Sequence, residues 1–283
     1  MNKTKIDWCD RSWNPVTGCR YGCEYCYAID IAHRFGGHHI MGVEPLDSFG
    51  GHNILHGFEG IFDVKEPLKI KTKGKSNNWV KLVTAPFPYG FCPTIYRYRL
   101  DQPQHLKQPQ NIFVGSMCDL FGEWVPDEWI KTVFEACEKA PQHRYLFLTK
   151  NPKGIWRDGV PILKDAWYGT TITRQADLER ISHLILEGNR FISIEPILEP
   201  INLSARPVKA AIPFADWVII GVETGDRKGK VIPKRDWIEN IVCDCRHQGI
   251  PVFMKDSLQE VWGNTLIQEY PWDGAKKQGV DHD

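Results

Sequence analysis

Three cysteines near the amino terminus are spaced for binding one metal centre. Cys19, Cys23 and Cys26 lie within eight residues, and the aromatic Tyr25 directly precedes the last of them. One loop can therefore wrap three thiolates around a single centre, and thiolates select iron–sulfur clusters or zinc. A structural zinc site normally has a fourth Cys or His ligand, whereas a [4Fe–4S] cluster on three cysteines keeps one iron open for an exogenous ligand. The pattern favours the cluster, with zinc and unligated buried cysteines as the alternatives.

Polar residues also follow short apolar runs in the rest of the chain. Because chemistry in a parallel barrel lies at the carboxyl ends of the strands, we expect these residues to face the cysteines; contact with solvent is the alternative explanation for each. The runs occupy residues 111–117, 145–150, 167–173, 191–196, 216–224 and 251–256. The polar residues at their ends are Ser116, Asp119, Thr149, Lys150, Thr171, Thr173, Glu195, Glu223, Thr224, Lys255 and Asp256.

The apolar runs and the segments between them predict the fold. Short runs bounded by turn residues are typical of strands buried on both faces. Residues 126–140, 175–187 and 234–248 carry apolar side chains at helical spacing. Alternation of strand and helix implies parallel βαβ units. With one more strand before Cys19, the prediction is an α/β fold, a partial or full (β/α) barrel of about six or seven parallel strands. A doubly wound open sheet is the alternative.

Residues 36–110 break this alternation and are rich in Gly, Pro, His, Lys and aromatic residues. A loop of this length inside a compact domain is usually functional. We interpret the segment as an irregular insertion over the barrel mouth, with a short hairpin or helix, within a single domain of residues 1–283. Its histidines, expected to be exposed loop residues rather than metal ligands, are His38, His39, His52 and His56.

The insertion also carries rings and cations in close succession. The guanidinium groups of Arg suit phosphate or carboxylate groups, and aromatic rings suit planar bases. One interpretation is therefore a nucleotide or nucleic acid substrate, which Arg97 and Arg99 would bind on the pocket wall. A solvated basic loop with aromatics in the core is the other. The residues concerned are Lys69, Lys71, Lys73, Lys75, Trp79, Tyr96, Arg97, Tyr98 and Arg99.

Composition excludes several classes of protein. The chain has 283 residues, 42% of them hydrophobic, which argues against disorder. Lys plus Arg and Asp plus Glu number 35 each, so no bulk charge attracts nucleic acid or anionic membranes. No apolar run approaches the roughly 20 residues of a membrane span, and residues 1–10 lack the apolar core of a signal peptide. We therefore expect a cytoplasmic protein without a membrane partner.

The nine cysteines are better explained as ligands or buried thiols than as disulfides in such a compartment. Cys243 and Cys245 would diverge on a helix, and Cys137 fits a core face. An auxiliary cluster on Cys9, Cys92 and Cys118 is a weaker alternative.

The cysteine loop resembles the signature of the radical S-adenosylmethionine superfamily, C-x3-C-x-aromatic-C. The resemblance implies that the open iron binds the amino and carboxylate groups of S-adenosylmethionine, and that one electron then cleaves a carbon–sulfur bond to give a 5′-deoxyadenosyl radical. It places Tyr25 near the adenine. Within the superfamily the chain resembles a phage-associated family of unassigned function, through residues 8–28, 116–121, 125–127, 148–150, 193–196, 221–225 and 253–255.

The same resemblance implies roles for strand-end residues. Gly115 and Ser116 would contact the methionine amino group, and Lys150 would neutralise the methionine carboxylate or hold a substrate phosphate. The ribose hydroxyls would bind Glu195 or the threonines Thr171 and Thr173. The adenine would pass the backbone of Gly221 and Glu223. An external electron donor of the flavodoxin or ferredoxin type is implied as a partner, and the substrate stays open.

Overall fold

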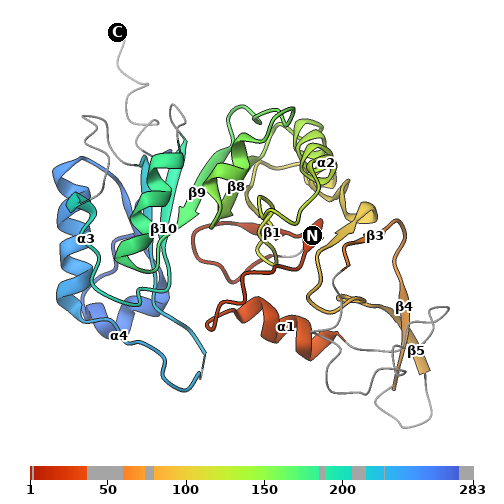
Figure 1. Cartoon of the computed structure of the whole chain (residues 1–283), viewed down its shortest axis with the longest axis horizontal. Helices are drawn as coiled ribbons and strands as arrows, with labels where there is room; N and C mark the ends of the chain where they lie inside the picture. Colours follow the sequence, from red (N-terminus) through yellow and green to blue (C-terminus); the bar gives the residue numbers. More distant parts are fainter. Residues whose placement is uncertain are drawn as a thin grey trace.

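Seven parallel strands form a curled sheet that makes half a barrel (Figure 1). The computed structural model describes residues 1, 3–36, 60–73, 80–184, 189–205, 215–225 and 227–273. The strands follow one another across the sheet in sequence order, which confirms the partial barrel over the doubly wound sheet, where the order reverses at a switch point. They are β1 (Arg11–Trp13), β7 (Asn111–Val114), β8 (Arg144–Thr149), β9 (Trp167–Thr171), β10 (Arg190–Ile194), β11 (Trp217–Ile220) and β12 (Val252–Met254).

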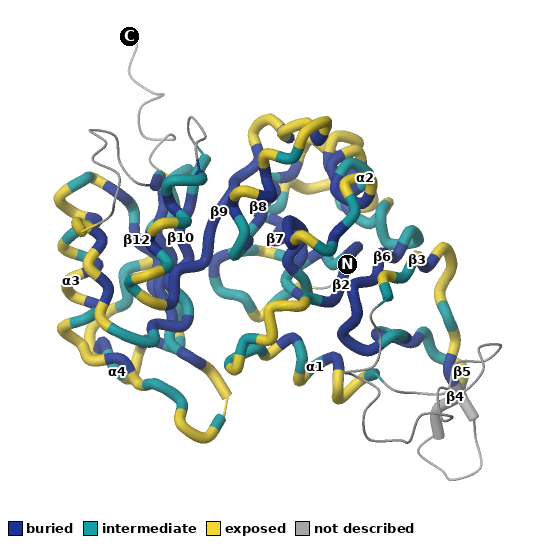
Figure 2. Tube along the Cα trace, viewed as in Figure 1, coloured by how far each residue is buried: buried dark blue, intermediate teal, exposed yellow. Residues whose placement is uncertain are grey.

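Side chains alternate between the two faces of this sheet, as the period of two in a strand requires. Both faces are buried along most of each strand (Figure 2). The outer face packs against the helices, with Tyr145, Phe147 and Tyr168 on β8 and β9 and mostly Ile and Val side chains on β10 to β12. The inner face carries a mostly aromatic cluster of Trp8, Phe113, Leu146, Trp167, Phe191, Trp217, Ile219 and Phe253.

Helices α2 (Asp127–Glu138) and α3 (Arg235–His247) cover the outer face, close to the predicted ranges. Residues 175–187 were expected to be α-helical, but Gln175–His183 is a 3-10 helix. Its buried residues Leu178 and Ile181 are three apart, a spacing that suits either kind of helix, so the sequence could not separate them.

Two further α-helices were not predicted from the sequence. Helix α1 (Tyr27–Phe35) starts directly after Cys26 and buries Ala28 and Ala32. Helix α4 (Gln259–Trp262) follows β12 and ends at Gly263, whose φ of 73° is the left-handed conformation typical of a helix stop. The remaining 3-10 turns are Arg97–Arg99, Gln102–His105, Pro152–Trp156, Leu203–Ala205 and Asp256–Leu258.

The described part of the insertion contributes strands to two small sheets beside α1, beyond β1 (Figure 1). The hairpin that the sequence suggested is present as β4 (Lys69–Lys73) and β5 (Val80–Thr84). The second sheet combines β2 (Val16–Thr17), β6 (Thr94–Tyr96) and β3 (Phe62–Val64). The predicted loop residues His38, His39, His52, His56, Lys75 and Trp79 lie outside the described residues.

Two segments, one before β1 and one after α4, pack inside the half-barrel. Trp8 packs its ring 4.7 Å from Phe113, and the Asp7 carboxylate accepts the backbone N–H of Asp256 at 2.9 Å. The amino-terminal segment therefore links the two edges of the curled sheet. Tyr270 and Trp272 pack against Trp217 from the carboxyl-terminal segment. Among the described residues, no helix has the length and apolar character needed to cross a membrane.

Candidate functional site

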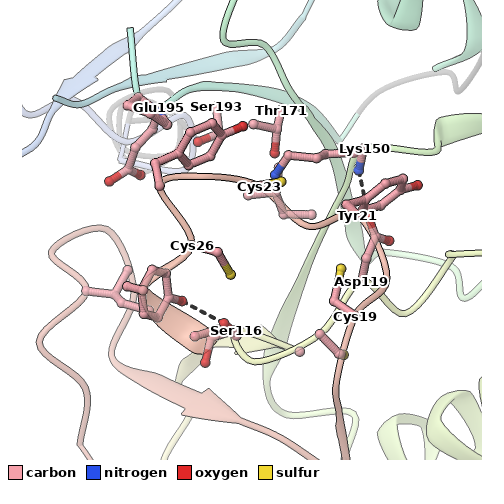
Figure 3. A pocket seen from close by; sticks show the side chains of 18 of the residues that line it. Cys19, Tyr21, Cys23, Cys26, Ser116, Asp119, Lys150, Thr171, Ser193 and Glu195 are labelled. Atoms are coloured by element: carbon pink, nitrogen blue, oxygen red, sulfur yellow. Dashed lines mark hydrogen bonds between the residues drawn. The ribbon is translucent and has the colours of Figure 1, made fainter. Parts of the chain in front are cut away.

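A pocket of about 1090 Å³, counting the space open at its mouth, lies at the carboxyl ends of the strands (Figure 3). Alternation along each strand directs every second side chain inward, so the residues just past the strand ends meet here. Ten of the predicted site residues line it: Cys19, Cys23, Tyr25, Cys26, Gly115, Ser116, Lys150, Thr171, Glu195 and Glu223.

The three-cysteine loop, residues 19–26, connects β2 to helix α1. It starts at Gly18, where φ is 92° and an added Cβ would lie 2.3 Å from the Cys92 backbone, so only glycine fits. It ends at Cys26, whose backbone N–H donates to the Cys23 carbonyl at 3.1 Å. The close backbone approach at Gly18 and the hydrogen bond at Cys26 fix the shape of the loop that carries the three sulfur atoms.

Burial raises the pKa of the Cys19 thiol to about 12 and also raises that of Cys26. The backbone N–H groups of Ile29 and Ala28, at the start of α1, oppose this for Cys26 by hydrogen bonding to its sulfur. Each thiol would release its proton on binding a metal, as thiolate ligands do.

The three thiols of the cysteine loop are the candidate ligands of a metal centre. The sulfur atoms of Cys19, Cys23 and Cys26 point toward one shared space (Figure 3). In a [4Fe–4S] cluster each cysteine binds a different iron, so its ligands stand around a larger centre. The three thiols and the space between them suit that arrangement.

Lys150 extends into the pocket from the end of β8. The buried Asp119 positions it, because its carboxylate accepts the Lys150 backbone N–H at 2.7 Å and the Thr149 hydroxyl at 2.6 Å. The Lys150 ammonium lies 5.6 Å from the centre of the Tyr25 ring. Burial alone would lower the pKa of Lys150, but interactions with Tyr25 and Cys23 outweigh it and raise the pKa, so the group is a cation facing the cysteine loop.

Glu195, after β10, forms an ion pair with Lys255, after β12. Gly221 lies beneath the pair at the end of β11: an added Cβ would be 3.0 Å from the Lys255 side chain and 3.1 Å from that of Glu195. Gly221 therefore does not line the pocket itself, and its role is to leave room for two charged side chains to meet across an intervening strand.

Ser116 and Gly115 form the tight turn after β7. Gly115 has φ of 81°, and an added Cβ would lie 2.9 Å from the Cys118 sulfur. The Ser116 hydroxyl bonds to the Asn14 side chain, and its carbonyl accepts the Tyr27 hydroxyl at 2.6 Å. The turn is thus tied to both β1 and α1 and fixes one wall of the pocket.

Glu223 and Thr173 are engaged with protein partners. The buried Glu223 carboxylate accepts the Arg227 guanidinium at 2.5 and 2.8 Å, and Arg227 in turn lies 3.6 Å from Glu24 in the cysteine loop. Thr173 does not line the pocket: its hydroxyl donates to Asp177 at 2.9 Å, on the other side of the cysteine loop. Both residues support the walls of the site.

Comparison with known proteins gives a family but no activity. The model of the DUF5131 family, described as a protein of unknown function, matches residues 3–282. The chain belongs to the DUF5131 family. No curated protein and no solved structure matches it. In this DUF5131 chain the pocket is therefore the feature from which a function can be inferred.

The structure bears on two interpretations that the sequence left open. One of them placed Arg97 and Arg99 on the pocket wall, but neither residue lines it. Arg97 pairs with Asp63 at 2.8 Å, and Arg99 donates to backbone carbonyls and covers the Tyr96 ring at 3.8 Å. Both guanidinium groups bind partners in the same chain, so the interpretation of a nucleotide substrate loses its main support. Of the described part of the insertion, Phe91 reaches the pocket.

The weaker alternative of an auxiliary cluster gains no support from the positions of its three cysteines. Cys118 lines the pocket, whereas Cys9 packs against the inner aromatic cluster and Cys92 is buried behind Gly18. Cys137 lies in the core, as expected, and Cys243 and Cys245 diverge on α3 into exposed and buried positions.

Several pocket residues of this DUF5131 chain were not assigned roles from the sequence. Lys255 was recognised only as a polar strand end, and its proximity to Glu195 depends on the curl of the sheet. Tyr27 and Asn14 gave no signal, because their contacts with Ser116 join segments about a hundred residues apart. Arg227 follows Glu223 by four residues, and this i, i+4 spacing could have suggested their ion pair.

Proposed function

We propose that this chain is an enzyme of the radical S-adenosylmethionine type, which binds a [4Fe–4S] cluster on Cys19, Cys23 and Cys26. One observation carries the proposal: the three cysteines line a single pocket with charged residues from several strands, at the carboxyl ends of a parallel half-barrel. The resemblance of the cysteine spacing to the superfamily signature supports it. The bound cluster would supply the electron that cleaves S-adenosylmethionine into methionine and a 5′-deoxyadenosyl radical.

The protein's own part is to hold the cofactor and exclude water. S-adenosylmethionine carries an ammonium, a carboxylate and two ribose hydroxyls. The Lys150 ammonium suits the carboxylate, and Glu195 suits the ribose hydroxyls, with Lys255 balancing its charge. Apolar lining from Trp8, Phe113 and Leu148 keeps the base of the pocket dry, which protects reactive intermediates.

Anaerobic reconstitution with iron and sulfide tests the proposal. We expect a brown protein with about four irons per chain that releases 5′-deoxyadenosine and methionine from S-adenosylmethionine when dithionite is the reductant. Mass spectrometry and iron analysis measure the two outcomes. Cys19→Ala, Cys23→Ala and Cys26→Ala should each lose the cluster and the cleavage.

Cys243→Ala is the matched control, because Cys243 is exposed on α3, away from the pocket. It should keep both iron and activity. A colourless protein with one zinc, or full iron content in all three ligand variants, would show instead a zinc-stabilised binding module or a wrong ligand assignment.

A further inference from the structure

The hairpin of β4 and β5 is strongly basic. Residues 67–100 contain seven Lys and Arg and no Asp or Glu, in a chain whose charges balance overall. Two of these cations, Arg97 and Arg99, bind partners of the same chain. The other five are lysines of residues 69–81, and three of them occupy alternate positions of β4. The excess positive charge is therefore concentrated on this hairpin.

The three lysines of β4 share one face with their partners on β5, because directly opposed residues of an antiparallel pair lie on the same face. The other face carries Ile70, which is buried with Ala85 in a small apolar cluster. One face of the hairpin thus packs on its own core, and the other, here called the lysine face, carries a row of cations. The opposed pairs on the lysine face are Lys69 and Thr84, Lys71 and Leu82, and Lys73 and Val80.

The lysine face is open to solvent where the structure describes its side chains. Lys69 is exposed, and Leu82 is 54% exposed. The Lys69 ammonium donates to the Thr84 hydroxyl at 3.0 Å, and this neutral partner leaves its charge unbalanced. Figure 1 shows the hairpin beyond α1, on the side away from the half-barrel, and none of its described residues lines the pocket. The lysine face is therefore a separate surface.

We propose that the lysine face binds duplex DNA, with the hairpin lying along the major groove and the lysines in reach of the phosphates that flank it. This groove is about 12 Å wide and accepts a two-stranded β-ribbon. Alternate residues of a strand are about 7 Å apart, so the row of three lysines extends over roughly 14 Å and meets successive phosphates of a linear polyanion. The proposal goes beyond the proposed function and does not depend on it.

The shape and composition of the lysine face favour duplex DNA over other polyanions. The major groove of an RNA duplex is deep and narrow, so it does not admit a ribbon. Binding to a membrane surface depends on buried apolar area as well as on cations, whereas the described part of this face exposes a single large apolar side chain, Leu82. A row of like charges without carboxylates among them suits a regular phosphate backbone.

The salt dependence of binding to a short fluorescent duplex DNA tests the proposal, with the full chain both cluster-free and reconstituted. Each lysine that contacts a phosphate adds about 0.9 to the slope of log affinity against log salt concentration. Changing Lys69, Lys71 and Lys73 together to Gln should therefore reduce this slope by about 2.7 and weaken binding at low salt. Changing the same three to Arg should keep the slope, since Arg keeps the charge.

The single variant Lys71→Gln keeps the test decisive if the triple variant fails to fold, since its slope should fall by about 0.9. Lys81 is paired with Thr72 on the other face of the hairpin, so Lys81→Gln should reduce the slope by less. An unchanged slope in Lys71→Gln and in a folded triple variant would overturn the proposal. The lysines would then serve to keep the exposed strand edges from associating.

The matched control makes the same change of charge elsewhere on the surface. Lys139, Lys153 and Lys164 are exposed and lie outside the hairpin. Changing these three to Gln should leave the salt slope and the affinity for DNA unchanged. If the control weakened binding as much as the hairpin variant, the lysine face would not be the binding surface.

Three further probes separate duplex DNA from other polyanions: single-stranded DNA, polyglutamate, and vesicles that contain phosphatidylserine. At equal salt we expect the duplex to bind most tightly and to lose the most affinity in the triple Gln variant. Tighter lysine-dependent binding of any other probe would refute the duplex proposal. The triple Gln variant should still release 5′-deoxyadenosine at the wild-type rate without DNA, so failure of the proposed function and failure of DNA binding are measured separately.

Discussion

The two ends of the inner face of the half-barrel are built from the same strands but have opposite characters. At the amino end, Trp167 and Trp217 meet Trp272 in a cluster of rings with centroids 5.2 to 6.3 Å apart. At the carboxyl end, two or more residues farther along, the inward positions hold Thr171, Ser193 and Gly221 or charged groups such as Glu195 and Lys255.

The two ends therefore contribute differently, one to stability and the other to ligand binding. The ring cluster buries large apolar areas and supplies stability, since each aromatic ring buries roughly 150–250 Å². The carboxyl end leaves space and places charges in it, which contributes little to stability. Substitutions at the amino end should therefore change the free energy of unfolding, and substitutions at the carboxyl end should change ligand binding.

Trp217→Ala should produce the largest effect. Trp217 is fully buried, and its indole N–H donates to the Glu269 carbonyl at 2.9 Å. Truncation leaves a cavity and an unpaired carbonyl, so we expect the free energy of unfolding to fall by about 3–5 kcal/mol. Urea titration followed by circular dichroism measures it. A fall in the free energy of unfolding of less than about 1 kcal/mol would mean that the ring cluster is not the main source of stability.

Lys255→Met should affect binding more than stability. It leaves the Glu195 carboxylate without its partner in the pocket. We expect affinity for S-adenosylmethionine to fall about tenfold, or about 1.4 kcal/mol, measured by calorimetry on reconstituted protein. The melting temperature should change little, because the pair is partly exposed. Lys164→Met, on the surface far from the pocket, is the control that should change neither quantity.

Gly221→Ala should have a smaller effect on the same pair. The added methyl would lie 3.0 Å from the Lys255 side chain, whose flexible end can move aside by a few tenths of an ångström. We expect a loss of affinity of only about threefold, about 0.6 kcal/mol. If Gly221→Ala were as damaging as Lys255→Met, the glycine would contact the cofactor directly, as the sequence analysis had supposed.

The smallest expected effect is on the pH dependence of the free energy of unfolding. Hydrogen bonding to Arg227 lowers the pKa of Glu223 below its ordinary value of 4.5, and Arg246 does the same for Glu269 at the amino end. A carboxyl with a lowered folded pKa stabilises the fold above pH 4.5 and loses that contribution as pH falls toward the folded pKa.

Glu223→Gln and Glu269→Gln should therefore each flatten the decline of stability below pH 4.5, as measured by urea titrations at a series of pH values. Glu223→Gln should in addition weaken cofactor binding, because Arg227 and the cysteine loop lose their anchor. Equal cofactor affinity in both variants would mean that the Glu223 pair serves stability alone.

The sequence predicted most of the sheet because its signals are local. Six of the seven strands carry their own apolar run, β1 (Arg11–Trp13) being the exception, and the cysteine spacing needs no tertiary context. The prediction was weaker where spacing is ambiguous, as for Leu178 and Ile181 in the 3-10 helix. It left two interpretations open for Arg97, because a run of rings and cations looks the same whether its partner is a ligand or, as here, Asp63 and Glu128 of the same chain.

Sequence alone thus determined the half-barrel strands, the three-cysteine loop and the polar strand ends, since each depends on residues within one short segment. Only the tertiary structure decided which of those ends face the same space. Pairing of Glu195 with Lys255 requires the sheet to curl over Gly221, and the approach of Arg227 to Glu24 joins segments some two hundred residues apart. Such contacts arise from packing between distant segments, on which local periodicity carries no information.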